Sequence, residues 1–407
     1  MRSDPQRQSF EIHARDGAAR AGTLHTAHGP VSTPAFIPLA TKATVRGLDS
    51  AEVAALGYQL ILGNTFHLFV SPGHERIADA GGLHSFMGWE GALITDSGGF
   101  QVFSLAHGNV ADEVKGSGLK GGSEEGAILE IAEEGVRFRS YRDGAERFIS
   151  PEVSMEVQAA LHSDIALVFD ECTPYRADRD YTARSTDRTH RWLDRCLDWH
   201  DREGPADQAV FGIVQGGVHE DLRRESAQLV SASRVDGLAI GGTLGRDKAE
   251  MRGVLEMTVP HLPAESPKHL LGIGEVDDLL GGIELGLDIF DCAVPTRLAR
   301  HGVALAPDPD QRFRLNLRKA GWAGDRSPLV EGCPCSACTH HDRDYLSYLS
   351  RAQELTALRL LVVHNLTYME ALLAGARDAI GTGTFARYHA TIRDGGTPWE
   401  AASQPAR

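Results

Sequence analysis

The sequence predicts an α/β protein built on a (β/α)8 barrel, and three observations lead to this prediction. The chain has 407 residues, of which 42% are hydrophobic, and its 41 Lys and Arg against 56 Asp and Glu give a formal net charge of −15, a composition typical of a folded globular protein. Eight short apolar runs end abruptly in polar or glycine residues. Segments with helical spacing separate these runs, and eight strands that alternate with helices favour a closed parallel barrel.

The predicted strands recur along the chain, and each is short and apolar. They span residues 34–39, 58–62, 92–94, 165–169, 209–214, 237–240, 269–273 and 287–290. Helix signals lie between them. Ser150 is a typical N-cap residue, Pro151 follows at the first helical position, and Val153, Val157 and Leu161 then fall on one face. We therefore expect amphipathic helices around the barrel.

Two stretches break this alternation. Residues 107–129 are rich in glycine and charge, which predicts a mobile surface insertion. After it, residues 136–140 and 146–150 flank Asp143-Gly144, a pair typical of a hairpin turn. The second break, residues 313–364, contains a cluster of cysteines. We therefore predict a single domain over residues 1–407, with an insertion at 107–129 and a subdomain at 313–364.

The sequence also predicts the cellular location of the protein and limits its partners. No apolar run approaches the roughly 20 uncharged residues of a membrane helix, and the first seven residues lack the apolar core of a secretory signal. We therefore expect a cytoplasmic protein that does not enter a membrane. The net charge of −15 argues against general binding of polyanions, so a nucleic-acid partner would need a local basic patch.

The cysteine cluster predicts a metal site. Cys333, Cys335 and Cys338 place three thiols on a tight turn, and His364 follows 26 residues after Cys338. In a reducing compartment such a cluster is more typical of metal than of disulfides, and four nitrogen and sulfur ligands form a closed, structural Zn²⁺ site. The histidines at positions 340 and 341 are rival ligands, and free thiols are the alternative to any metal.

Polar residues follow the predicted strands, where the carboxyl ends of a barrel converge on one mouth. Asp96, Asp170 and Asp291 each end a different strand. A single aspartate at such a position is more often structural, because it caps the next helix. Three together instead favour metal binding or glycosidic-bond chemistry, in which one carboxylate is the nucleophile and another the acid/base.

The neighbours of these aspartates suit a planar ligand such as a nucleobase. Gly98 and Gly99 allow close approach of the backbone, and Phe100 offers a face for stacking. Asp170 and Gln215 can accept and donate hydrogen bonds along the edge of a base.

At this point the motifs resemble those of bacterial-type tRNA-guanine transglycosylases, over roughly residues 10–380. The matching segments, in the order of that family, are Asp96-Ser-Gly-Gly-Phe-Gln, Phe169-Asp-Glu-Cys-Thr-Pro, Phe211-Gly-Ile-Val-Gln-Gly-Gly, Phe290-Asp-Cys-Ala-Val-Pro-Thr-Arg, the three cysteines and His364-Asn-Leu. The resemblance implies an irregular (β/α)8 barrel with a zinc-binding subdomain near its carboxyl end, often in a homodimer. It also implies exchange of guanine at the wobble position of tRNAs with GUN anticodons for a 7-deazaguanine base, in queuosine biosynthesis.

The resemblance assigns roles to particular residues. Asp291 is similar to the nucleophile, which attacks the ribose and forms a covalent ester, and Asp96 is similar to the general acid/base. One structural Zn²⁺ per subunit would be held by Cys333, Cys335, Cys338 and His364. The base pocket would be formed by Asp96, Ser97, Gly98, Gly99, Phe100, Asp170, Gln215 and Gly242.

For the tRNA anticodon stem-loop, the family uses two segments. They correspond here to Gly272, Ile273, Gly274, Glu275, Val276, Asp277 and Asp278, and to Thr296, Arg297, Leu298, Ala299 and Arg300. Charge supports the second segment, because residues 297–319 contain an excess of basic side chains over acidic ones. A solvated charged face is the alternative interpretation of this patch.

The chain departs from the family pattern at three places. Residues 241–246 read Gly-Gly-Thr-Leu-Gly-Arg, one residue shorter than usual and without the expected glutamate, so the incoming base is either the 7-aminomethyl precursor or queuine. Glu275 stands where a lysine is common, which weakens the expected contact with phosphate. The insertion at 107–129 replaces a short basic stretch, so contacts with RNA can differ there too.

Three other functions remain as alternatives. A non-catalytic RNA-binding partner of the same fold would not need Asp96 and Asp291, which are both present. A metal-dependent hydrolase would need histidines at the strand ends, where His67 is the nearest candidate. An archaeal-type exchange enzyme would need an appended RNA-binding domain, for which we expect no room in this chain.

Overall fold

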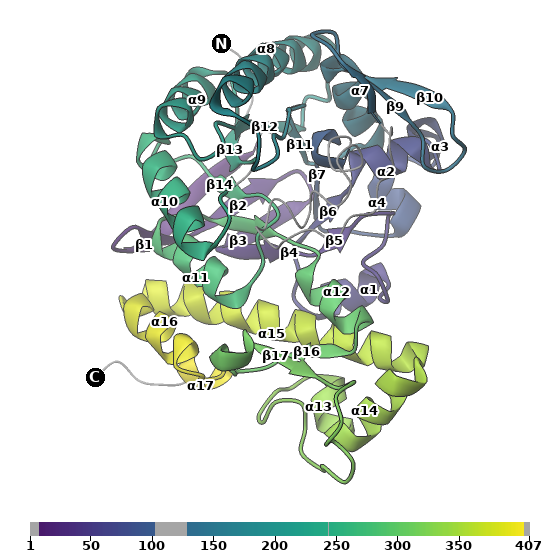
Figure 1. Ribbon diagram of the computed structural model, residues 1–407, viewed down its shortest axis with the longest axis vertical. Coiled ribbons are helices and arrows are strands. Elements are labelled where there is room, and N and C mark those ends of the chain that lie inside the picture. Colours follow the sequence, from purple (N-terminus) through teal and green to yellow (C-terminus); the bar gives the residue numbers. More distant parts are fainter. Residues whose placement is uncertain (1–7, 102–127, 243, 403–407) are drawn as a thin grey trace.

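A parallel sheet that curls into a nearly closed barrel forms the centre of the protein (Figure 1). The structure is a computed structural model that describes residues 8–101, 128–242 and 244–402. Neighbouring strands follow the order β4-β15-β14-β13-β12-β11-β7-β6-β5. Their bounds are β4 (Ala35–Ile37), β5 (Leu39–Ala40), β6 (Leu60–Gly63), β7 (Ala92–Thr95), β11 (Ile165–Leu167), β12 (Ala209–Val214), β13 (Gly237–Ile240), β14 (Lys268–Leu270) and β15 (Ile289–Asp291).

The sheet closes around Pro38, which separates β4 from β5 in one stretch of chain. β4 pairs with β15 and β5 pairs with β6, so the predicted strand 34–39 supplies both edges of the sheet. Proline has no N–H and interrupts the ladder, but the Pro38 carbonyl accepts a bond from Leu62 N at 3.1 Å. All eight predicted strands are present, and the barrel of the sequence prediction is confirmed with its first strand split.

Two predicted strands extend too far at their carboxyl ends. The strand expected at 165–169 ends at Leu167, and the second case is the strand expected at 269–273. Residues 269–273 were expected to be extended, but β14 ends at Leu270. Gly272 has a φ of 73°, a conformation that suits glycine, and its N–H bonds to a side chain, Asp291, instead of to a neighbouring strand. The strand therefore ends three residues earlier than its apolar pattern indicates.

Helices surround the barrel, as the alternating pattern predicts. Figure 1 shows α7 to α11 around the upper and left sides of the sheet and α15 across its lower side. The bounds are α1 (Ser50–Ala55), α2 (Thr65–Val70), α3 (His74–Asp79), α4 (Gly82–Met87), α7 (Pro151–Leu161), α8 (Arg179–Glu203), α9 (Glu220–Ala232), α10 (Lys248–Thr258), α11 (Val276–Glu284), α12 (Val294–Arg300), α13 (Ser336–His340), α14 (Arg343–Ala352), α15 (Leu355–Gly381), α16 (Phe385–Arg393) and α17 (Pro398–Ala402).

Three smaller antiparallel sheets accompany the barrel. The predicted hairpin forms between β9 (Val136–Arg139) and β10 (Glu146–Ile149), and β8 (Ile128–Ile131) adds a third strand. Most of the predicted insertion, residues 107–127, lies outside the described residues, while residues 128–129 begin β8. Sequence analysis did not predict the sheet of β1 (Ser9–Asp16), β2 (Ala19–Thr26) and β3 (Gly29–Thr33), or the pair β16 (Val303–Leu305) and β17 (Arg314–Asn316).

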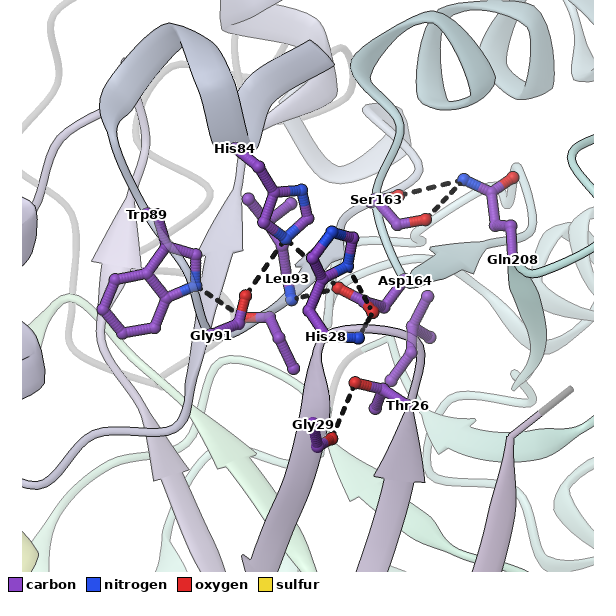
Figure 2. A network of polar contacts seen from close by, with 12 residues as sticks. Thr26, His28, Gly29, His84, Trp89, Gly91, Leu93, Ser163, Asp164 and Gln208 are labelled. Carbon is purple, nitrogen blue, oxygen red and sulfur yellow. Dashed lines mark hydrogen bonds and ion pairs between the residues drawn. The ribbon is translucent and has the colours of Figure 1, made fainter. Parts of the chain in front are cut away.

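The amino-terminal sheet is fastened to the amino ends of the barrel strands by two buried aspartates. Asp164, just before β11, accepts bonds from His28 N and Nδ1 at 2.9 Å and from Leu93 N at 2.8 Å (Figure 2). Asp288, just before β15, accepts a bond from Arg20 Nε at 2.7 Å. These contacts cover the end of the barrel that lies opposite the carboxyl ends of its strands.

The carboxyl-terminal part packs along one long helix. α15 contacts β1, β2, β4, α12 and α17, and α13 and α14 lie against it (Figure 1). Among the described residues α15 is the one helix long and apolar enough to cross a membrane, but 61% of its apolar stretch is buried inside the protein. Packing against the barrel therefore explains why α15 is so apolar, as in the core helix of a folded domain.

The hydrogen bonds of Asp164 predict that this residue stabilises the fold at neutral pH and loses this effect in acid. Burial alone would raise the pKa of Asp164, but the hydrogen bonds from His84 and His28 outweigh burial and lower it from 3.8 to about 2. Such a group stabilises the fold fully above about pH 4 and loses its effect as the pH falls towards about 2. We expect Asp164→Asn to lower the free energy of unfolding by about 2 kcal/mol at pH 7 and to remove part of this acid dependence.

Urea unfolding at pH 7, 4 and 3 measures both effects. Asp394→Asn is the control, because the Asp394 side chain is 73% exposed and its nearest basic atom lies at 3.6 Å. Equal losses of stability for the two variants at pH 7 would contradict the role of Asp164.

Candidate active site

A cavity of about 220 Å³ opens at the carboxyl ends of the barrel strands. It is large enough for a small heterocycle. Its wall is formed by Leu39, Thr41, Leu62, Asn64, Asp96, Ser97, Phe100, Gln101, Leu167, Asp170, Cys172, Ile213, Gly241, Gly242, Leu244, Leu271, Gly272, Ile273, Asp291, Cys292, Ala293 and Arg297. The structure therefore brings the three aspartates of the sequence analysis into one cavity with mostly apolar surroundings.

Asp96 follows β7 and is held by three donors. Asn64 Nδ2 lies 2.5 Å and Gln101 Nε2 2.9 Å from its Oδ2, and Thr65 N lies 2.8 Å from its Oδ1. Burial raises the pKa of Asp96, the bonds from Thr65 and Gln101 lower it in part, and the charge of Asp291 raises it again, to about 7. A carboxyl group with a pKa near neutrality can both donate and accept a proton, as a general acid/base must.

Asp291 is the last residue of β15 and is fixed through one oxygen. His269 Nε2 lies 2.9 Å from Asp291 Oδ1, and Gly272 N donates to the same oxygen at 3.0 Å. The Asp291 side chain is 10% exposed, and it lines the cavity. Two hydrogen bonds to one oxygen stabilise an ionised carboxylate in this partly dry site, which is the form a nucleophile requires.

Asp170 forms a polar group with Ser97 and Gln215. Ser97 Oγ donates to Asp170 Oδ1 at 2.8 Å, and Gln215 Nε2 donates to Oδ2 at 2.6 Å. Burial raises the pKa of Asp170 to about 6, although both hydrogen bonds oppose this shift. At neutral pH the carboxylate is thus mostly ionised and can accept N–H donors from a ligand in the cavity.

Two glycines permit this arrangement because no side chain fits at their positions. A Cβ on Gly99 would lie 2.4 Å from the carbonyl oxygen of Asp170. A Cβ on Gly242, which has a φ of 78°, would lie 2.2 Å from Gln215 Oε1. Both contacts are far shorter than real Cβ atoms tolerate, so these positions depend on glycine.

The predicted base pocket divides into lining and supporting residues. Asp96, Ser97, Phe100, Asp170 and Gly242 line the cavity. The supporting members are Gly98 against Phe66, Gly99 against Asp170, and Gln215, which reaches the cavity wall through Asp170.

Sequence analysis did not single out three residues that hold the carboxylates. Gln101 and Thr65 donate to Asp96, and His269 bonds to Asp291. Gln101 stands inside one of the motifs, so a search of that motif for side-chain donors could have found it. Thr65 and His269 carry no comparable signal, because one acts through its backbone and the other lies within an apolar strand.

The first predicted RNA segment, residues 272–278, is mostly integrated into the protein. Glu275 forms an ion pair with Arg314, and Lys248 Nζ lies 2.5 Å from Asp277 and 3.0 Å from Asp278. Two basic side chains thus partly offset the charge of three acidic ones, and Arg314 is partly withdrawn from the basic patch. The other members are Gly272 and Ile273 at the cavity, Gly274 against Cys292, and the buried Val276.

The second predicted segment, residues 296–300, presents positive charge at the cavity. Arg297 lines the cavity, and burial and the charges of Arg46 and Arg297 lower the pKa of Arg300. None of these three arginines forms an ion pair with another described residue. The remaining members of the segment are the buried Thr296 and Ala299 and the half-buried Leu298.

The cysteine cluster has the geometry of a tetrahedral metal site. His364 Nδ1 lies 3.7 Å from Cys333 Sγ, 3.5 Å from Cys335 Sγ and 3.3 Å from Cys338 Sγ. A zinc ion with bonds of about 2.3 Å to sulfur and about 2.1 Å to nitrogen separates these atoms by about 3.6 Å. His364 Nε2 bonds to the Leu305 carbonyl at 2.8 Å, which directs Nδ1 towards the thiols. The buried Cys333, Cys335, Cys338 and His364 thus fit a structural zinc site.

A second group of ligand-type side chains lies at the opposite end of the barrel. His28, His84 and Asp164 offer atoms within 4.8 Å of one another. The two imidazole rings are stacked with centroids 3.6 Å apart and planes at 15° (Figure 2). A metal ion lies in the plane of each imidazole that binds it, so two stacked rings do not direct their lone pairs at one ion. We interpret this group as structural.

Comparison with known proteins agrees with the motifs. The family model of queuine tRNA-ribosyltransferase matches residues 16–395. A queuine tRNA-ribosyltransferase of Roseiflexus sp. is 48% identical over 393 residues, which cover 94% of this chain and 98% of the relative. Relatives of the same name from Symbiobacterium thermophilum and Oleidesulfovibrio alaskensis are 45% identical over 382 residues and 44% over 397, covering 93% and 97% of this chain and 89% and 98% of their own. The family resemblance is therefore confirmed.

The metal site gives a direct prediction. We expect Cys335→Ala to bind much less than one zinc ion per chain and to unfold more easily, by several kcal/mol, because a structural ion contributes its binding energy to folding. Zinc content by elemental analysis and thermal unfolding measure the two effects. Cys196→Ala is the control, because Cys196 is an equally buried thiol on α8. Wild-type zinc content in Cys335→Ala would contradict the assignment.

Proposed function

Because this chain belongs to the queuine tRNA-ribosyltransferase family, we propose that it is a tRNA-guanine transglycosylase that exchanges guanine at the anticodon wobble position for a 7-deazaguanine base, in queuosine biosynthesis. Its substrates are tRNAs with GUN anticodons, which carry aspartate, asparagine, histidine or tyrosine. One observation carries the proposal. Asp96 and Asp291 face one small cavity, where Asp96 has a pKa near neutrality and Asp291 accepts two hydrogen bonds on one oxygen.

The proposed reaction proceeds by two displacements at the ribose. The Asp291 carboxylate attacks the anomeric carbon, a C–O bond forms, and the bond between ribose and guanine breaks through an oxocarbenium-like transition state. The product is a covalent ester between Asp291 and the RNA. The 7-deazaguanine base then attacks the same carbon and displaces Asp291, so two inversions give net retention.

Asp96 moves the proton in both displacements. The leaving guanine carries the electron pair of the broken bond and needs a proton, and the entering base must lose one. A group with a pKa of about 7 is present in both forms at neutral pH, so Asp96 can donate the first proton and accept the second. Its hydrogen bonds to Asn64 and Gln101 keep the carboxyl group in place during this exchange.

Polar side chains bind the edge of the base, and the aromatic ring of Phe100 contacts its face. The Asp170 carboxylate accepts hydrogen bonds from the N–H groups on the edge of guanine. Ser97 and Gln215 orient this carboxylate through their own hydrogen bonds to it. Phe100, on the cavity wall, stacks on the planar ring. The backbone at Gly242 and the side chain of Leu244 lie where they can contact the rest of the ring, because both line the cavity.

The tRNA anticodon stem-loop binds across the mouth of the cavity. Arg297 and Arg300 contact phosphates next to the wobble nucleotide. Arg297 lines the cavity with Asp291, Arg300 lies near Arg297, and neither arginine forms an ion pair with another described residue. Residues 272–278 contact the RNA through their backbone, because their acidic side chains form ion pairs with Lys248 and Arg314. The working form is a cytoplasmic homodimer with one structural zinc ion in each subunit.

Incorporation of labelled bases into wobble-guanine tRNA tests this function. Guanine, the 7-aminomethyl precursor and queuine are supplied in parallel to the purified protein. Preference for the precursor places the enzyme in the biosynthetic route, and preference for queuine makes it a salvage enzyme whose residues 241–246 set specificity. Absence of exchange with all three bases would contradict the proposed function.

Asp291→Asn tests the nucleophile. An amide does not attack the ribose, so we expect the exchange rate to fall by on the order of a thousandfold or more, with no RNA–protein adduct on a denaturing gel. Asp164→Asn is the control, because that aspartate lies at the opposite end of the barrel and should leave exchange unchanged. An adduct that survives in Asp291→Asn would remove Asp291 from this role.

The pH dependence of binding tests Asp170. Burial raises its pKa to about 6, so the carboxylate that accepts N–H bonds is lost as the pH falls below that value. We expect the KM for guanine to rise by roughly tenfold for each pH unit below about 6. In Asp170→Asn the KM should be high throughout and should not change in this range. A KM that is constant from pH 5 to 7 in the wild-type protein would contradict this assignment.

A further inference from the structure

His269 occupies a position beneath the cavity that its sequence context does not explain. It lies within β14 and is fully buried, and its Nε2 lies 2.9 Å from Asp291 Oδ1. The other ring nitrogen, Nδ1, is also buried, and it has no hydrogen-bond partner in the described part of the chain. A buried polar atom that lacks a partner is costly, so the one bond that this side chain makes needs an explanation.

The two contacts determine which nitrogen carries the proton. An ionised Asp291 only accepts hydrogen bonds, so a bond at 2.9 Å requires a proton on Nε2 of His269. A proton on Nδ1 would be buried with no acceptor within the described residues, whereas an unprotonated nitrogen there leaves only a lone pair. His269 therefore carries a proton on Nε2 and acts as a donor to Asp291.

This donor makes the two oxygens of Asp291 unequal. Oδ1 accepts from His269 Nε2 and from Gly272 N, while Oδ2 accepts no bond from any residue that the structure describes. The Asp291 side chain lines the cavity. An oxygen with two donors is held and partly neutralised, and an oxygen without donors keeps its lone pairs for reaction.

We propose that His269 is a positioning residue which, together with Gly272 N–H, locks Asp291 through Oδ1 and reserves Oδ2 as the atom that attacks the ribose. The inference rests on the proposed function, because it concerns the nucleophile of that reaction. In the first displacement Oδ2 forms the bond to the anomeric carbon, and the leaving guanine takes the electron pair. In the second displacement the same bond breaks, and the donors on Oδ1 stabilise the carboxylate as it regains its charge.

Three substitutions of His269 distinguish a role in positioning Asp291 from a role in packing alone. In His269→Gln the side-chain N–H reaches about as far as His Nε2 and can bond to Asp291. His269→Asn is also polar but too short to reach it, and His269→Leu fills the space without a donor. We expect the Asn and Leu variants to lower the kcat of guanine exchange by about a hundredfold with an unchanged KM, and the Gln variant to restore most of the rate.

The control removes a mostly buried histidine far from the cavity, His84, whose side chain is 10% exposed. His84 Nε2 bonds to the Gly91 carbonyl at 3.0 Å near the other end of the barrel, so His84→Leu is expected to lose stability and keep its kcat. Thermal unfolding of every variant identifies any that fail to fold, and the comparison of Gln with Asn then uses only folded proteins.

The outcomes are distinct. Equal kcat values for wild type, Asn and Leu would overturn the inference, and so would equal losses in all three His269 variants, because the Gln variant should then have been rescued. A crystal structure of the trapped adduct with the ester on Oδ1 would also overturn it. If the wild-type protein itself exchanges no base, the proposed function fails instead.

Discussion

Closure of the parallel sheet is the constraint on which the site depends. The stretch around Pro38 supplies both edges, so β15 and β6 are joined through β4 and β5 and all strand ends meet at one mouth. Asp96 and Asp291 are separated by almost two hundred residues, yet both lie in that mouth. The amino-terminal sheet is fastened to the opposite end of the barrel through Asp164 and Asp288.

Asp96 and Asp291 carry the same chemical group, but the cavity places them in different surroundings. Burial and the charge of Asp291 raise the pKa of Asp96 to about 7, so Asp96 is ready to exchange protons. Asp291 accepts hydrogen bonds from His269 and Gly272 on one oxygen, and in the proposed mechanism the other oxygen attacks the ribose. Burial is the largest cause of the raised pKa of Asp96, and the hydrogen bonds that Asp96 accepts only partly oppose it.

The sequence predicted the barrel strands because strands covered on both faces form continuous apolar runs. It did not predict β1 to β3, because these strands contain no continuous apolar run. The residues of β1 alternate between exposed and half-buried positions, and half-buried or exposed residues interrupt the buried ones of β2 and β3. The zinc ligands were visible in their spacing, and the aspartates were visible because they end strands. His269 could not be identified, since a histidine inside a strand pattern gives no sign of which atom it faces. The pairing of Glu275 with Arg314 joins segments that the pattern treats separately.

The most direct test of this account is to locate the covalent bond between protein and RNA. The adduct is trapped with wobble-guanine tRNA, digested with nuclease and trypsin, and fragmented in a mass spectrometer. The account predicts a ribose-linked mass on the peptide of residues 269–297, at Asp291, and an unmodified peptide of residues 77–115, which contains Asp96. A ribose-linked mass at Asp96 would contradict the assignment of nucleophile and acid/base.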